Sequence, residues 1–218
     1  AAALIALALR YADDAIAGGT SITAADALTI VSTNDDVNFG PLSSGGDTTL
    51  SAGGDLTLSM APTVGGNYSI TADDWFGMGV FSPNFVGTGN DFSITDSEGS
   101  LTIGSRTAPG DLSITTIAGD LFIVGPLSAG GATGADAGNI TLTSGAGLGW
   151  SGDLRLSGSL NAAGDTVTLN AGGLINQTGG TITADTLQAN THAVTGGVVN
   201  LGQAGNDVTT LAASSGNG

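Results

Sequence analysis

Short apolar pairs recur along most of the chain, each pair split by one polar residue and preceded by a Gly-Asp, Gly-Asn or similar dipeptide. In "GGDTTLSAGGDLTLS", residues 45–59, this phrase occurs twice in succession. Gly adopts positive φ angles readily, and the side chain of Asp or Asn can hydrogen-bond to nearby backbone. Each dipeptide therefore predicts a turn. The alternation that follows predicts a short strand with one apolar face. We therefore expect Leu56 and Leu58 to be buried and Asp55 and Thr57 to lie outside.

The phrase keeps the same parity along most of the chain. It occurs at residues 46–51, 54–59, 66–71, 90–95, 99–104, 110–115, 119–124, 138–143, 152–157, 164–170, 179–184, 196–201 and 206–211, with a looser version at 20–32. No long stretch with helical periodicity separates these strands, which excludes βαβ units. A sandwich would join longer strands through Asn-Gly or Asp-Gly hairpins, and these dipeptides do not occur between the phrases.

These features predict an all-β chain folded as a parallel β-helix, a β-solenoid. Two or three phrases would fill a coil of roughly 20 to 30 residues. Roughly 8 to 10 coils, stacked at about 4.8 Å, would give a rod of roughly 40 to 50 Å. We expect a single segment over residues 1–218, with residues 1–19 as an N-terminal cap or first coil. Residues 72–98 interrupt the phrase and are expected to form an irregular, aromatic-rich insertion.

Composition narrows the range of partners and of chemistry. The formal charge is −16, with 19 acidic residues, three Arg and no Lys. Such a chain cannot build a surface that tracks phosphates, so nucleic acid is excluded, and anionic membrane surfaces are excluded for the same reason. Its apolar runs are too short to insert into a membrane. The absence of Cys removes disulfides, thiolate metal sites and cysteine nucleophiles.

The C-terminal third, residues 162–218, resembles the repeat region of filamentous-haemagglutinin-like adhesins, large exoproteins that Gram-negative bacteria export by two-partner secretion. The resemblance is carried by "GDTVTLNAGGLINQTGGTITADTL" and "VNLGQAGNDVTTLAA". The repeated phrase is similar back to about residue 45, although the length of the repeat there is different. It implies a right-handed β-helix, exposure at the cell surface and a role in adhesion or biofilm formation, and it brings no catalytic residues. The N-terminal secretion domain of that family is not identifiable in this sequence.

The insertion at residues 72–98 supplies a candidate patch for a ligand or partner. Aromatic rings beside paired carboxylates could stack on a sugar ring while the acids bind its hydroxyls; alternatively, the rings form a small satellite core. The candidate residues are Asp73, Asp74, Trp75, Phe76, Phe81 and Phe85. Separately, Phe122 and Val124 fall on the outward parity of their phrase, which makes them a candidate lateral contact.

We expect no enzymatic activity and no catalytic residues. Adjacent Asp pairs on a strand face opposite ways, whereas a glycosidase needs two carboxyl groups about 5 to 9.5 Å apart across one bond. His192 is the single histidine, and no G-x-S-x-G nucleophile motif accompanies it. No cofactor or metal site is expected, because the calcium-binding nonapeptide of β-rolls has no strict match. Weak Ca²⁺ binding by scattered Asp turns stays open.

Thr-x-Thr triplets at residues 141–143, 166–168 and 181–183 raise ice binding as another class of function. The triplets are not regularly spaced along the sequence and are mixed with Ser and Asp. The sequence alone therefore does not favour ice binding.

The leading hypothesis is a structural and adhesive shaft segment of a secreted bacterial surface exoprotein. Its expected location is extracellular, on the surface of a Gram-negative bacterium. Its expected partners are the chain itself, through end-to-end stacking or continuation of the same chain, and host-surface or matrix glycans. The alternative is a self-assembling extracellular filament or surface-layer subunit, and a polysaccharide-active β-helix enzyme ranks third.

Overall fold

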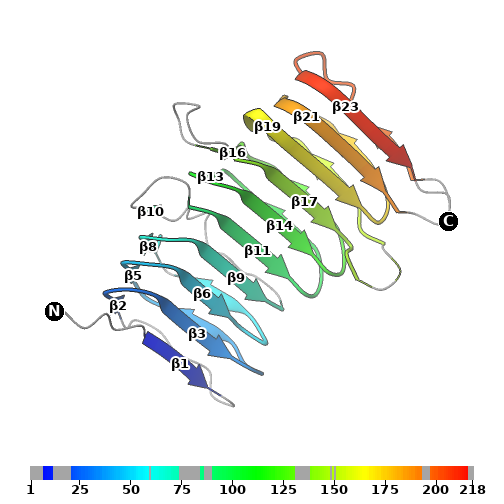
Figure 1. Ribbon diagram of the computed structural model, residues 1–218. Coiled ribbons are helices and arrows are strands. Elements are labelled where there is room, and N and C mark those ends of the chain that lie inside the picture. Colours follow the sequence, from blue (N-terminus) through cyan, green and yellow to red (C-terminus); the bar gives the residue numbers. More distant parts are fainter. Residues whose placement is uncertain are drawn as a thin grey trace.

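The predicted parallel β-helix is confirmed. The computed structural model describes residues 7–11, 21–58, 60–73, 84–85, 90–130, 138–147, 149, 151–192 and 197–215. Over these residues it contains strands and no helix, and the parallel strands stack as a β-solenoid of about 8 turns (Figure 1). The number of turns lies at the lower end of the predicted range.

One sheet, called here the central sheet, runs from one end of the molecule to the other (Figure 1). In stacking order its strands are β1 (Leu7–Tyr11), β3 (Leu28–Ser32), β6 (Thr48–Ser51), β9 (Tyr68–Ala72), β11 (Phe92–Asp96), β14 (Leu112–Thr116), β17 (Ile140–Ser144), β19 (Leu160–Ala171), β21 (Ile182–Thr191) and β23 (Asp207–Ser215). β1 pairs in parallel with β3, with Leu7 opposite Leu28. The described part of the N-terminal region is therefore a rung of the solenoid.

Two further faces complete the coils. The first side face precedes the central strand in each coil and comprises β2 (Ile22–Ala24), β5 (Leu42–Ser44), β8 (Thr63–Val64), β10 (Asn84–Phe85), β13 (Arg106–Ala108), β16 (Leu127–Ala129) and the beginnings of β19, β21 and β23. The second side face follows the central strand and comprises β4 (Val37–Phe39), β7 (Leu56–Leu58), β12 (Leu101–Ile103), β15 (Leu121–Ile123), β18 (Leu154–Leu156), β20 (Ile175–Gln177) and β22 (Val199–Asn200). Most coils therefore have three sides.

The core consists of apolar columns that run along the solenoid. Leu56 and Leu58 are buried, as the alternation predicts. One column of the central sheet aligns Ile30, Leu50, Ile70, Ile94, Ile114, Leu142 and Leu169, and all of these side chains are at most 2% exposed. Because each strand buries only two or three side chains, the burial of apolar area that stabilises the fold comes from this stacking and not from any single coil.

The last coils depart from the predicted pattern of short strands. β19 has 12 residues and β21 has 10, and each continues from the first side face into the central sheet. The prediction of a turn followed by a short strand is wrong here. The pairing of β19 with β21 has an irregularity between Ala162 and Thr166. Gly164 lies within it with a φ of +87°, so a β-bulge makes the corner without ending the strand.

Candidate functional surfaces

The turns before the central strands are joined by hydrogen bonds between coils. The Oδ1 atom of Asp47 accepts a hydrogen bond from the backbone N–H of Asn67 at 2.8 Å, and that of Asn67 accepts one from Asp91 at 2.9 Å. The same contact links Asp91 to Asp111 at 2.9 Å and Asp111 to Asn139 at 2.8 Å. The repeated Asp or Asn was expected to bond within its own turn. In the structure, its side-chain oxygen instead accepts a hydrogen bond from the equivalent backbone amide of the next coil.

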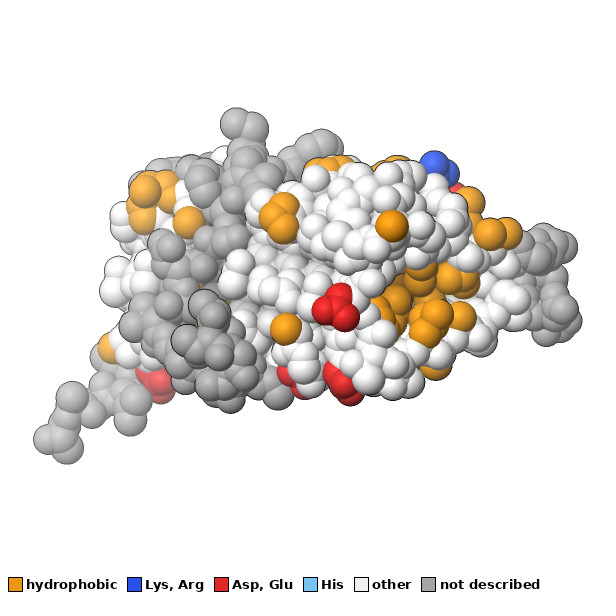
Figure 2. All heavy atoms as spheres, turned by 90° about the horizontal axis from the view of Figure 1, so that it is seen from above, with side chains coloured by type: hydrophobic (Ala, Val, Ile, Leu, Met, Phe, Trp, Pro, Cys, Tyr) orange, Lys and Arg blue, Asp and Glu red, His pale blue; other side chains and the backbone are white. Residues whose placement is uncertain are grey.

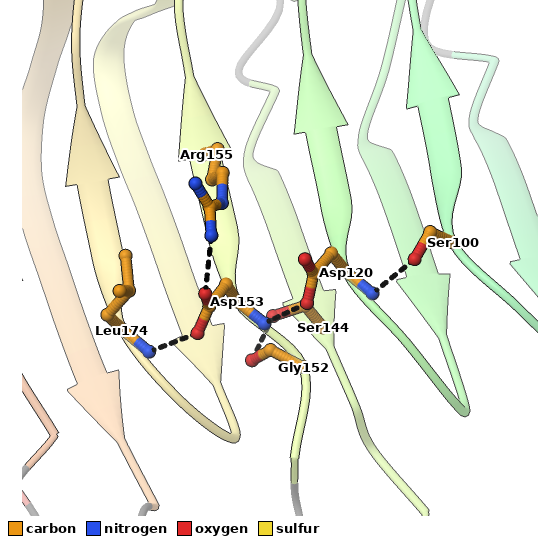
Figure 3. Close-up of polar contacts among 7 residues, drawn as sticks. All are labelled: Ser100, Asp120, Ser144, Gly152, Asp153, Arg155 and Leu174. Carbon is orange, nitrogen blue, oxygen red and sulfur yellow. Dashed lines mark hydrogen bonds and ion pairs between the residues drawn. The ribbon is translucent and has the colours of Figure 1, made fainter.

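A second ladder of this kind precedes the second side face (Figure 3). Ser100 Oγ accepts from the N–H of Asp120 at 3.0 Å, and Asp120 Oδ1 accepts from the N–H of Asp153 at 2.8 Å. Asp153 Oδ1 in turn accepts from Leu174 at 2.9 Å, while its Oδ2 forms an ion pair with Arg155 at 2.9 Å. These carboxylates bind backbone amides that the turns would otherwise leave without a partner, so their role is to hold coils together.

The glycine that precedes the aspartate is required by the close approach of successive turns. Gly119, just before Asp120, has a φ of +77°, which favours glycine. A Cβ added there would also collide with the carbonyl oxygen of Gly99 in the preceding coil. The repeated Gly-Asp dipeptide is therefore a device for stacking turns backbone to backbone.

The predicted ligand patch is described only at two of its residues. Asp73 is half-buried, and its Oδ1 accepts a hydrogen bond from Ser97 Oγ at 2.5 Å. Phe85 lies in β10 opposite Val64, and the structure describes its backbone alone. The other members, Asp74, Trp75, Phe76 and Phe81, lie outside the described residues. Asp73 thus links two coils, and ligand binding by the patch stays a prediction.

An aromatic and cationic cluster inside the solenoid was not found from the sequence. Tyr68 and Phe92 stack with ring centroids 5.5 Å apart and are buried in neighbouring strands of the central sheet. Arg106 of the first side face is also buried, and its NH1 donates to the carbonyl oxygen of Ser105 at 2.8 Å. Burial lowers the pKa of Arg106 to about 10 and raises that of Tyr68. The Tyr68 hydroxyl is buried without a hydrogen-bond partner among the described residues.

The predicted lateral contact lies on the outer surface of the second side face. Val124 is 56% exposed, and Phe122 is half-buried. The guanidinium of Arg155 lies 5.9 Å from the ring centroid of Phe122. The exposed Arg155 pairs with Phe122 in register. The outward orientation is as the alternation predicts, and association through these residues stays a prediction.

The outer side of the central sheet carries a regular set of hydroxyl groups, called here the hydroxyl array. It comprises the outward residues of six adjacent strands, β3, β6, β9, β11, β14 and β17. One column is Thr29, Thr49, Ser69, Ser93, Ser113 and Thr141; the other is Val31, Ser51, Thr71, Thr95, Thr115 and Thr143. Every member except Val31 is Ser or Thr, so this face is uncharged in a strongly acidic chain.

Neither a cluster of metal ligands nor a membrane-spanning helix occurs among the described residues. No group of three or more His, Asp or Glu side chains in these residues could hold a metal ion. None of the described residues forms a helix that is long and apolar enough to cross a membrane. One hollow lies at the bulge of β19, where Gly164, Thr183, Asp185 and Asp207 are among the lining residues.

A family model described as repeats of unknown function (DUF5649) matches residues 5–74 and 89–148, which is more than half of the chain. The chain belongs to this family of repeats. The matched stretches cover most coils that have Gly-Asp turns, and they leave out residues 75–88, within the interruption noted in the sequence. No curated protein and no solved structure gave a significant match. The resemblance to filamentous-haemagglutinin-like adhesins therefore still rests on the sequence phrases alone.

Proposed function

We propose that this chain is a structural and adhesive shaft segment of a secreted bacterial surface exoprotein. Its task would be to extend a surface away from the cell for adhesion and biofilm formation. The observation that carries this proposal is the central sheet, in which parallel pairing continues through all ten described strands from β1 to β23. In a solenoid each repeat contacts only its neighbours, so coils can be added without altering the fold.

Two kinds of link between coils support the proposed role as a shaft. Apolar columns bury side chains between rungs, and the Asp and Asn ladders join the turns at two corners. The DUF5649 match supports a repeat architecture, and the resemblance of residues 162–218 supports the proposed location at the surface of a Gram-negative bacterium. Host-surface or matrix glycans are the partners that we propose for adhesion.

The test is to locate the chain and to remove it in its source bacterium. An antibody raised against the purified chain should label intact cells, while an antibody to a cytoplasmic marker should not. An in-frame deletion of residues 21–215 should reduce attachment to glycan-coated surfaces and the mass of biofilm. Labelling that requires permeabilised cells would overturn the surface location. Unchanged attachment and biofilm after the deletion would overturn the adhesive role.

A self-assembling filament or surface-layer subunit is the second candidate, and one observation favours it. Leu211 of β23 is 63% exposed, whereas Leu187, its partner in the preceding rung, is 3% exposed. Val198 is also exposed, and Figure 2 shows hydrophobic side chains gathering toward the end that carries the C-terminal strands in Figure 1. A further rung, from the same chain or from a second copy, would cover these side chains.

Sedimentation velocity distinguishes the two candidates. Species that grow with concentration in the unaltered chain, and are lost in Leu211→Glu, would support assembly through this end. A single species at all concentrations would contradict the filament and leave the shaft as the proposal. Leu211 is exposed, so Leu211→Glu should leave the fold intact, and circular dichroism checks this.

A further inference from the structure

The hydroxyl array is a two-dimensional lattice of like groups. Adjacent strands of a sheet are about 4.8 Å apart, and outward side chains two residues apart on one strand are separated by roughly 6.6 Å. The register places Ser93 opposite Ser113 and Thr95 opposite Thr115, with the neighbouring strands following without a shift. Figure 1 shows these strands lying side by side along the molecule. The array therefore repeats in both directions over six rungs.

Most of its hydroxyl groups are not used by the protein. Apart from Thr143, the Ser and Thr side chains of the array have no hydrogen-bond partner among the described residues. The same column changes character beyond Thr143. Asn190 donates to Asn170 at 3.1 Å, and Ser214 donates to Asn190 at 2.8 Å, so these side chains bind one another. Within these columns of the central sheet, the free hydroxyl groups are therefore concentrated in the array, whereas Asn170, Asn190 and Ser214 bind one another.

The chemistry of this face selects among partners. It is uncharged and lacks aromatic side chains at its outward positions, so it offers neither ion pairing nor a stacking platform for a sugar ring. Burial against another protein would remove water from eleven closely spaced hydroxyl groups, and each hydroxyl left unpaired costs free energy. An ordered lattice of water can donate to and accept from every hydroxyl, while Thr methyl groups lie between them.

We propose that the hydroxyl array is an ice-binding surface. Hexagonal ice presents its oxygen atoms in a regular lattice, and the array presents hydroxyl oxygens that also repeat regularly in two directions. The array acts by holding a layer of water in positions that a growing crystal can incorporate. This function is independent of where the chain is located and of its role as a shaft.

The array was hidden in the sequence because its members are not local. The Thr-x-Thr triplets at 166–168 and 181–183 do not belong to its six strands, and Thr183 lies on the first side face. The array is assembled from residues 20 to 28 positions apart, such as Thr95, Thr115 and Thr143. Ser, Thr and Asp are mixed along the sequence, but the register places the Ser and Thr side chains of these strands in a regular lattice that contains no Asp.

The test is the partition of the purified chain into slowly grown ice, together with thermal hysteresis. The array variant is Thr95→Tyr with Thr115→Tyr, which places two large rings at the centre of the lattice. The matched control is Thr107→Tyr with Ser128→Tyr, two outward, adjacent positions of the first side face. We expect the unaltered chain and the control to be enriched in ice, and the array variant to be at least tenfold less enriched.

A gain of function complements this loss. Val31 is the member of the array without a polar side chain, and Val31→Thr should increase thermal hysteresis at equal concentration. Thermal unfolding of each variant checks that the fold is retained, and the Val31→Thr result stands even if the tyrosine variants unfold.

Three outcomes would overturn the proposal. The unaltered chain could be excluded from ice as completely as an added albumin. The array variant could enter ice as readily as the control. Finally, the unaltered chain could fail to enter ice yet bind crystalline cellulose or chitin, with binding lost in the array variant, which would assign the face to an insoluble polysaccharide.

Discussion

The molecule turns its corners in two ways, and the difference separates its early coils from its last ones. From β3 to β18 the strands are short and end at the corners, and side-chain ladders join successive turns at two of these corners. In β19 and β21 the chain crosses a corner within one long strand, through the bulge at Gly164. The first kind of corner needs contact with the neighbouring coil, whereas the second is made by the backbone of its own strand.

Within the last coils, successive rungs also differ in how well they are covered. Leu187 and Leu211 occupy one column, but only Leu187 has a rung on each side in the described structure. Truncation of Leu187 to Ala should therefore destabilise the fold by about 3 kcal/mol, through lost burial and the cavity left behind. Leu211→Ala should cost less than about 0.5 kcal/mol. Urea unfolding measures both, and equal costs would show that the end of the solenoid is covered in solution.

Alanine at a glycine of each corner tests the two turning modes directly. Gly119 and Gly164 both have positive φ, but a Cβ meets Gly99 only at Gly119, and nothing lies within 4 Å at Gly164. Gly164→Ala should cost about 1 to 2 kcal/mol from backbone strain alone. Gly119→Ala should cost at least about 3 kcal/mol because strain and collision add. Similar unfolding free energies for the two variants would contradict the close stacking of the turns.

The Asp ladder should contribute less to stability than the close stacking of the turns at Gly119. Asp120→Ala removes the acceptor for the amide of Asp153 and should destabilise by about 1 to 2 kcal/mol, because the group is only partly buried. Asp120→Asn keeps the acceptor and should be close to neutral. Asp185, an exposed carboxylate with no recorded hydrogen bond, is the matched control, and Asp185→Ala should have no measurable effect. Differential scanning calorimetry ranks the melting temperatures of the three variants. Equal melting temperatures would show that the ladder does not stabilise the fold.

A smaller effect than loss of the ladder is expected in the aromatic part of the core, which the last coils lack. Tyr68→Phe should stabilise by about 1 kcal/mol, since it removes a buried hydroxyl that has no partner in the described residues while keeping the stack on Phe92. Urea unfolding near neutral pH measures this change. A destabilised Tyr68→Phe variant would indicate that the hydroxyl is bonded.

The same cluster predicts a dependence on alkaline pH. Burial raises the pKa of Tyr68 above its ordinary value of 10.0, so the unfolded chain loses this proton first and stability falls as the pH rises above about 10. Arg106 acts in the opposite direction, because its pKa falls to about 10 in the folded chain and its contribution to stability rises above that pH. Unfolding free energies at pH 9 and 11 should therefore fall more steeply in the unaltered chain than in Tyr68→Phe. Parallel slopes would contradict the burial of the hydroxyl.

Sequence reasoning succeeded where the phrase was complete. The alternation in "GDLTLS" and "GDLRLS" fixes Leu56, Leu58, Leu154 and Leu156 as buried and Arg155 as exposed, and the structure agrees. It missed short strands that lack the phrase, such as β13 and β16 of the first side face. A strand of three residues is too short to show a clear alternation of apolar and polar residues. Its strand conformation comes from pairing with neighbouring coils.

The sequence by itself determined the class of fold, the inward parity of the repeats and the acidic, cysteine-free surface, because these follow from local alternation and composition. Only the tertiary structure decided which residues share a column. Register brings Asp120 to Asp153, Arg106 into the interior beside Tyr68, and Thr95 to Thr115 in the hydroxyl array. Coils of 20 residues and more separate these partners in the chain, and no local pattern specifies how one coil stacks on the next.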